Sequence, residues 1–218
     1  MNAEILSNVV IYVICLIMSI GVHEFCHAWA AERLGDSTPE MQGRLTLNPL
    51  VHADVIGTLV LPILAAIGSW PLLGWGRPVE TSPRNYTRKI RMRVGIALVS
   101  VAGPLGNLAL AVLALGLAVL IGQTLHLAPS IFRLIRLFVE LNVLLLVFNL
   151  LPIHPLDGGK ILAAYLPERL NYIDEFSLRF GPMILIALVI FAGSFLHIIL
   201  RPFMLPIDWV WLHWVVPT

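Results

Sequence analysis

The stretch ILSNVVIYVICLIMSIGVHEFCHAWAA, residues 5–31, reads as a membrane-spanning helix that carries ionisable side chains. Its first half is almost wholly apolar, and it then contains His23-Glu24-Phe25-Cys26-His27. A carboxylate at the centre of a bilayer costs about 2.5–3.5 kcal/mol on insertion scales, so this motif requires a compensating partner. Residues four apart share a helix face, so His23 and His27 can present two imidazoles to one metal ion. The pattern H-E-x-x-H is typical of zinc sites in which the glutamate, here Glu24, is the general base.

The composition indicates an integral membrane protein rather than a soluble enzyme. The 218 residues are 58% hydrophobic and 12% charged, with a mean hydropathy of +0.88, whereas soluble domains carry about 25% charged residues. The net charge of +1 gives no indication of nucleic-acid binding. Apolar stretches of membrane-spanning length cover residues 4–34, 55–73, 94–122, 131–151 and 181–200. A Trp-rich tail at residues 202–216 is either a sixth spanning segment or an interfacial one.

We therefore expect an all-α polytopic membrane protein, a bundle of about 5–6 transmembrane or re-entrant helices. A small β-hairpin-like element is expected near the candidate metal site, because residues 43–48 and 76–80 have short strand patterns. Pro78 would restrict the second of these strands to a sheet edge.

A catalytic zinc site needs a third protein ligand, and its fourth position is left to water. The candidates outside the first helix are His52, Asp54, His154 and Asp157. Asp157 follows a helix interrupted by two prolines and precedes two glycines, so its carboxylate could turn into a cavity. A helix-terminating turn with a surface aspartate is the alternative interpretation of this passage.

Together, the two passages resemble the signature of the site-2 proteases, intramembrane zinc metalloproteases that cut transmembrane segments of other proteins. That signature is H-E-x-x-H in an early transmembrane helix and N-x-x-P-x-x-x-x-D-G at the end of a later one, here at residues 149–158. Three further passages resemble the compact bacterial or archaeal branch, which lacks PDZ and CBS domains: GRLTLNP at 43–49, GWGRPV at 74–79 and AGPLGN at 102–107. The resemblance covers about residues 21–160.

The resemblance implies that His23, His27 and Asp157 bind one Zn²⁺ per chain and that Glu24 is the general base. Asn149 matches the family's asparagine near the metal, which implies that it positions a substrate carbonyl or stabilises an oxyanion.

Asn107 and His154 are further candidates for substrate positioning. Asn107 could instead bond between helices, and His154 could line the water path. The connections are too short to separate folded domains, so residues 1–218 are expected to form a single membrane-embedded peptidase domain. Its catalytic core would span about residues 5–160, and accessory C-terminal helices would span about 180–216.

The implied reaction is regulated intramembrane proteolysis, the hydrolysis of peptide bonds within or near transmembrane segments by zinc-activated water. The expected partners are a transmembrane protein substrate and the lipid bilayer, without nucleic acid. The identity of the substrate, the regulation and the oligomeric state stay open at this point.

Two alternatives remain. A metal-ion transporter could use the same side chains as a transit site, but it would often show inverted repeats and would not especially need Glu24. A catalytically inactive relative could bind transmembrane helices, although all the expected catalytic residues are present here.

Zinc ligation also constrains the topology. His27 and Asp157 must reach one ion, so the helix ends that carry them must face the same side of the bilayer. Three apolar stretches intervene, an odd number, so one does not span. Residues 55–73, which contain two glycines and two prolines, are the best candidate for a re-entrant segment. The basic stretch at 84–93 then places the active site on the cytoplasmic side of a multi-pass protein. The resemblance implies that this membrane is a bacterial or archaeal cell membrane.

Overall fold

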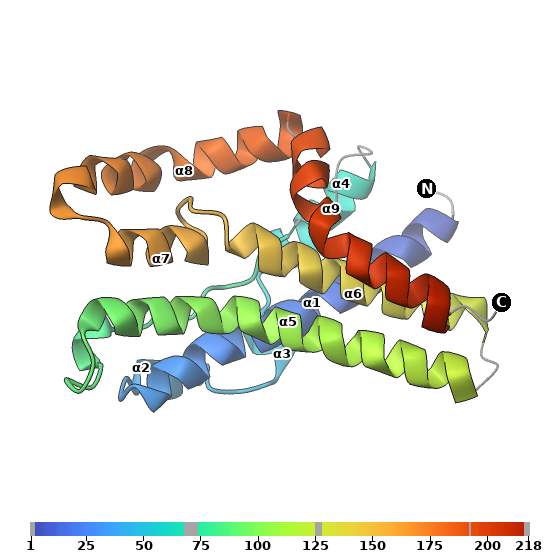
Figure 1. The fold of residues 1–218 in the computed structure, drawn as a ribbon, viewed down its shortest axis with the longest axis horizontal. Coiled ribbons are helices and arrows are strands. Elements are labelled where there is room, and N and C mark those ends of the chain that lie inside the picture. The colour runs from blue at the N-terminus through green and yellow to red at the C-terminus, as the bar shows by residue number, and fades with distance from the viewer. Residues whose placement is uncertain (1–2, 68–73, 125–127, 192, 216–218) are drawn as a thin grey trace.

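The computed structural model describes residues 3–67, 74–124, 128–191 and 193–215, which are mostly helical (Figure 1). The long helices are α1 (Ala3–Arg33), α5 (Met92–Thr124), α6 (Pro129–Asn149), α8 (Asn171–Phe191) and α9 (Gly193–Val210). The shorter helices are α2 (Thr38–Met41), α3 (Pro49–His52), α4 (Leu61–Ile67) and α7 (Asp157–Tyr165). The remaining short helical segments are the π-helices η1 (Val55–Val60) and η4 (Trp211–Val215) and the 3-10 helices η2 (Pro83–Asn85) and η3 (Glu168–Leu170). The predicted all-α class is confirmed for these residues, and the number of spanning helices stays a prediction.

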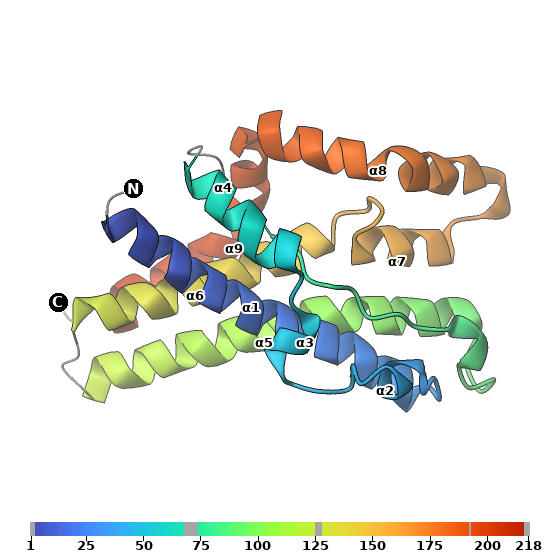
Figure 2. The ribbon, with the colours of Figure 1, turned by 180° about the vertical axis from the view of Figure 1, so that it is seen from behind.

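Two of the described helices are long and apolar enough to cross a membrane by their length and composition. They are Leu6–Arg33 within α1 and the whole of α5. Helix α5 runs alongside both α1 and α6 in the two opposite views of the molecule (Figures 1 and 2).

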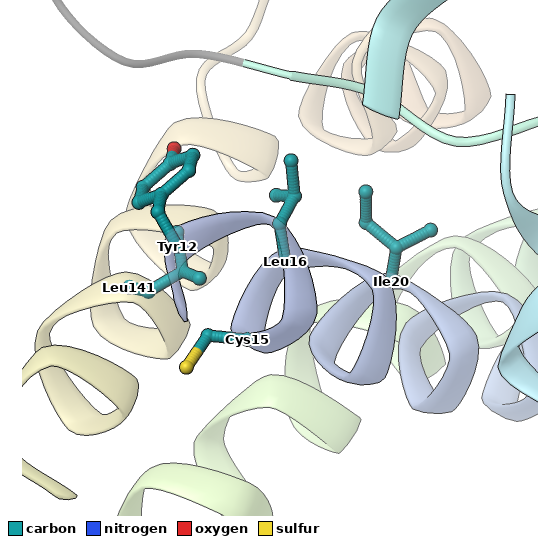
Figure 3. Packing of buried hydrophobic residues seen from close by; sticks show 5 residues of the cluster. All are labelled: Tyr12, Cys15, Leu16, Ile20 and Leu141. Atoms are coloured by element: carbon teal, nitrogen blue, oxygen red, sulfur yellow. The ribbon is translucent and has the colours of Figure 1, made fainter. Parts of the chain in front are cut away.

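The contact between α1 and α6 includes an apolar cluster. Tyr12, Leu16 and Ile20 follow one another along α1, and Leu141 of α6 lies beside Tyr12 (Figure 3). Association of helices in a bilayer depends on van der Waals packing and on small residues that allow close approach. Gly106 of α5 is such a residue, because a Cβ atom there would lie 2.7 Å from Cys26 Sγ on α1. Helices α1 and α5 therefore pack closely next to the His-Glu motif.

The expected β-hairpin-like element is not confirmed. Neither residues 43–48 nor 76–80 are assigned as a strand, and one isolated antiparallel bridge joins Ala53 to Gly76. Helix propensity explains part of the difference, since Asn48 caps α3 by accepting a hydrogen bond from Leu50 N at 3.2 Å. Pro78 has no N–H to extend a ladder on its side of the bridge.

The chain between α1 and α5 leaves one end of the molecule and returns to it. Thr87 N donates to Leu34 O at 2.6 Å, just beyond the end of α1. The buried Asp36 accepts hydrogen bonds from Ser82 N at 2.6 Å and from the Asn85 amide at 3.0 Å. A segment that begins and ends at the same end of a bundle has the course expected of a re-entrant segment. Residues 68–73 of that predicted segment lie outside the described part of the chain.

The C-terminal region differs from the expected apolar segment at residues 181–200. That segment is divided between α8 and α9, which lie at a wide angle to each other (Figure 1). The Trp-rich tail is helical as far as Val215. Arg136 of α6 holds it in place through a 2.7 Å ion pair with Asp208, with its guanidinium 5.4 Å from the centre of the Trp211 ring.

Candidate metal centre and active site

One turn of α1 supplies the two histidines of the site. His23 and His27 are both buried, and their Nε2 atoms lie 3.0 Å apart. The ring planes are nearly perpendicular, at 85°. The predicted helical spacing of four residues therefore brings the two imidazoles to one point.

The first residue of α7 completes the cluster. Asp157 Oδ2 lies 3.1 Å from His27 Nε2 and 3.2 Å from His23 Nε2. The other oxygen, Oδ1, accepts a hydrogen bond from Lys160 Nζ at 3.0 Å. The glycine at position 158 lets the start of α7, which carries Asp157, pack closely against Leu150. A Cβ atom at this position would lie 2.3 Å from Leu150 O. Among the described residues, His23, His27 and Asp157 are the group that could hold a metal ion.

The hydrogen bonds on the far side of each imidazole determine what faces the cluster. His27 Nδ1 lies 2.7 Å from Val99 O, and a backbone carbonyl can only accept, so the ring hydrogen is on Nδ1. His23 Nδ1 lies 2.6 Å from Asn107 Oδ1, which is likewise an acceptor. Both Nε2 atoms thus present lone pairs toward each other and toward Asp157.

Three acceptor atoms held this close repel one another unless a cation lies between them. Zn–N bonds of about 2.0–2.1 Å in tetrahedral geometry separate neighbouring ligand atoms by roughly 3.3 Å. The observed separations of 3.0, 3.1 and 3.2 Å are near that value. Two imidazoles and one carboxylate also form a donor set that catalytic zinc sites use. The residues present fit a zinc ion.

Gly103 of α5 leaves the room that the imidazoles need. A Cβ there would lie 2.3 Å from His27 Nε2 and 2.7 Å from His23 Cε1, closer than real contacts allow. We expect Gly103→Ala to displace both rings and to reduce zinc content and proteolysis together, as measured by metal analysis and a cleavage assay. Gly116→Ala on the same helix is the matched control, because no atom lies within 4 Å of its Cβ position. Full zinc content in Gly103→Ala would contradict this geometry.

A cavity of about 490 Å³ opens beside the cluster. Glu24 and Asn149 line it together with the three clustered side chains, and its remaining walls are largely apolar. Glu24 Oε2 accepts a hydrogen bond from Val79 N at 2.8 Å, so segment 74–80 holds the carboxylate in place. The Asn149 amide donates to Leu145 O at 2.9 Å, which leaves its Oδ1 without a described partner. A carboxylate next to a metal-binding cluster is the arrangement that general-base catalysis needs.

The other candidate residues lie outside the cavity lining. Asn107 is fully buried behind His23, where its amide is used in hydrogen bonds. His154 Nε2 pairs with Asp174 of α8 at 2.8 Å. His52 Nε2 bonds Thr46 O at 3.0 Å, and Asp54 caps η1 by accepting from Gly57 N at 2.7 Å.

Sequence reasoning missed three side chains around the site. Lys160 could have been found, because it stands three residues after Asp157 and so shares its helix face. Asn142 is an amide inside an apolar helix, a signal that calls for a partner. Ser19 carries no such signal, since its hydroxyl bonds Cys15 O at 2.8 Å as in many apolar helices.

Apolar helices thus hold a His-His-Asp cluster that could bind a metal ion, and comparison with known proteins gives the family. The family model of peptidase family M50 matches residues 119–192. The chain is 38% identical over 160 residues to "Putative zinc metalloprotease YwhC" of Bacillus subtilis (strain 168), which covers 71% of this chain and 68% of that protein. It is 34% identical over 189 residues to "Putative zinc metalloprotease Rip2" of Mycolicibacterium smegmatis, covering 85% of this chain and 70% of that protein.

A more distant similarity is to "Stage IV sporulation protein FB" of Bacillus subtilis, 32% identical over 162 residues, or 72% of this chain and 51% of that protein. No solved structure matches. The chain belongs to peptidase family M50, the site-2 protease family, and is a zinc metalloprotease of the site-2 type. The members of this family are membrane proteases.

Proposed function

We propose that this protein is an intramembrane metalloendopeptidase that hydrolyses peptide bonds within or near transmembrane segments of membrane proteins. His23, His27 and Asp157 would hold one zinc ion per chain, and Glu24 would act as general base. The observation that carries the proposal is the meeting of three lone-pair-bearing atoms, 3.0–3.2 Å apart, beside a cavity that also contains Glu24.

The residues of the cavity divide the chemistry between them. A bound zinc ion supplies an activated water, whose pKa falls to about 7, and polarisation of the scissile carbonyl. Glu24 takes a proton as water attacks and returns it to the leaving amine. The Asn149 amide oxygen and one of its amide hydrogens have no partner among the described residues, and this side chain orients the substrate backbone at the cavity wall. The apolar walls limit the access of bulk water and strengthen each of these polar contacts.

The substrate helix must be extended before cleavage, and segment 74–80 is suited to hold it. Arg77 N donates to His52 O at 2.8 Å, and Val79 N donates to Glu24. The N–H groups of these alternate residues thus lie along one edge of the segment and are already hydrogen-bonded. The N–H groups of Gly76 and Glu80 belong to the other edge and have no acceptor among the described residues. A substrate strand pairing with that edge would lie along the cavity by strand addition.

The direct test of the function compares the new N-termini in membranes of cells that produce the wild-type protein or Glu24→Gln. Chemical labelling of N-termini followed by mass spectrometry should find termini that need an active protein, and they should fall within or beside apolar segments of about 20 residues. No difference between the two membranes, or differences confined to soluble proteins, would overturn the proposal. The same comparison identifies the substrate.

The proposed topology is that of a single multi-pass domain with its active site toward the cytoplasm. It predicts that cysteines introduced at the exposed positions Ser37 and Arg88 react with an impermeant thiol reagent from the same side of oriented vesicles. A cysteine at Ser130, beyond the far end of α5, should react from the other side. The assay needs a background without Cys15 and Cys26. Labelling of Ser37 and Arg88 from opposite sides would show that residues 55–73 span the bilayer.

A further inference from the structure

A chain of buried polar side chains leads away from the metal cluster through three helices. His23 Nδ1 faces Asn107 Oδ1 on α5 at 2.6 Å, and Asn107 Nδ2 donates to Asn142 Oδ1 on α6 at 2.9 Å. Asn142 Nδ2 returns to Ser19 Oγ on α1 at 2.9 Å. All four side chains are buried, and Ser19, Asn107 and Asn142 are fully enclosed. Such groups are costly between apolar helices unless each one is hydrogen-bonded, which is the case here.

Backbone carbonyls at the far end of this chain fix the direction of every hydrogen bond in it. Phe138 O lies 2.8 Å from the Asn142 side-chain amide. A carbonyl oxygen cannot donate a hydrogen bond, so the amide atom that faces it must be the nitrogen, Nδ2. Asn142 Oδ1 is thereby turned toward Asn107. Ser19 O, another carbonyl oxygen, lies 3.3 Å from the Asn107 amide nitrogen. The Asn107 nitrogen must therefore face both Ser19 O and Asn142 Oδ1. Each amide has one orientation that satisfies all its partners.

These hydrogen bonds leave Asn107 only one group that can face His23, and that group is an acceptor, Asn107 Oδ1. The ring hydrogen of His23 must then be on Nδ1, and the lone pair must be on Nε2, which faces His27 and Asp157. If the Asn107 amide were reversed, its N–H would face Nδ1 and the ring hydrogen would move to Nε2. That tautomer cannot bind a metal ion through Nε2.

We propose that Asn142 and Ser19 are positioning residues of the metal site, which act through Asn107 to hold His23 in its metal-binding tautomer. The inference rests on the proposed function, because it presumes that His23 is a metal ligand. An asparagine pair whose only role is to bond helices together would contribute to folding and leave metal affinity unchanged.

The test is the zinc affinity of the purified full chain in detergent, measured by competition with a chromophoric chelator. Asn107→Leu, which keeps the size and removes the acceptor, should weaken zinc binding about 10- to 100-fold, the range found for outer partners of metal ligands. The zinc affinity of Asn142→Leu should lie between the affinities of Asn107→Leu and the wild type. The double variant should bind no more weakly than Asn107→Leu, because Asn142 acts through Asn107.

Asn107→Asp separates positioning from packing. Aspartic acid keeps an acceptor toward His23, and its neutral form also keeps a donor toward Asn142, so zinc affinity should stay within a few-fold of the wild type. Val139→Ala is the packing control, since Val139 is fully buried on the same helix as Asn142 and belongs to an apolar cluster. It should lower thermal stability and leave zinc affinity unchanged.

The outcomes distinguish the two proposals. If the wild type binds zinc and Asn107→Leu and Asn142→Leu bind it equally well, the positioning role is overturned and the metal site stands. If Asn107→Asp loses as much affinity as Asn107→Leu, the asparagine is structural and the role is again overturned. If the wild type itself binds no zinc, the proposed metal site fails. Should Asn107→Leu not fold, Asn142→Leu and Asn107→Asp still decide the question.

Discussion

Replacing Glu24 by Gln is expected to lower the rate of proteolysis by about 10²- to 10⁴-fold, the range that general acid–base catalysis contributes. Glutamine keeps the size of the side chain and an oxygen that can accept the hydrogen bond from Val79 N. It cannot take up a proton. Glu24 lies outside the His23, His27 and Asp157 group, so the variant should keep its zinc. Cleavage kinetics and metal analysis of one preparation measure both results.

Glu32→Gln is the matched control for this experiment. Glu32 lies on the same helix as Glu24, two turns beyond it, and is not part of the cavity lining. Its exchange should leave both cleavage and zinc content near the wild-type values. Cleavage by Glu24→Gln at close to the wild-type rate would end the assignment of Glu24 as general base. Loss of zinc from Glu24→Gln would instead place this side chain among the ligands.

Replacing Asp157 by Ala should remove both zinc and activity. The substitution leaves two imidazoles, whereas catalytic zinc sites use three protein ligands. It also removes the negative charge of the carboxylate and leaves the Lys160 ammonium, which contacts that carboxylate at 3.0 Å, without its partner near the site. We expect zinc affinity to fall by more than about 100-fold, beyond the range for residues that only support a ligand. Metal content after dialysis against a chelator measures this loss.

Asp54→Ala and His52→Ala are the controls, because both residues are alternative ligands by composition. In the structure Asp54 caps η1 and His52 bonds Thr46 O, so both variants should keep zinc. Full zinc occupancy in Asp157→Ala, together with loss in either control, would move the third ligand into the first loop.

The length of an apolar run was a good predictor of helices that cross the bundle. The predicted stretches 94–122 and 131–151 agree within about two residues with α5 (Met92–Thr124) and α6 (Pro129–Asn149). The run at 181–200 was misleading, because hydropathy does not show where a helix changes direction. In the structure, α8 and α9 share this run and point in different directions.

The metal cluster was largely predictable, and its surroundings were not. His23 and His27 follow from helical spacing, a local rule, and Asp157 followed from a resemblance between motifs. The contact of Val79 N with Glu24 joins positions 55 residues apart, and that of Asn142 with Ser19 joins positions 123 apart. No period in the sequence encodes such pairings, because they depend on how the helices pack. For Asn107 the structure favours the bond between helices over substrate positioning.

The ligand set is the central claim, and X-ray absorption at the zinc K-edge of the purified wild-type protein tests it most directly. The account predicts a four-coordinate spectrum with two imidazoles and additional oxygen neighbours at about 2.0–2.2 Å. Asp157→Ala, prepared in the same way, should retain little zinc. A spectrum with three imidazoles, or with a sulfur neighbour at about 2.3 Å from Cys26, would contradict the site formed by His23, His27 and Asp157.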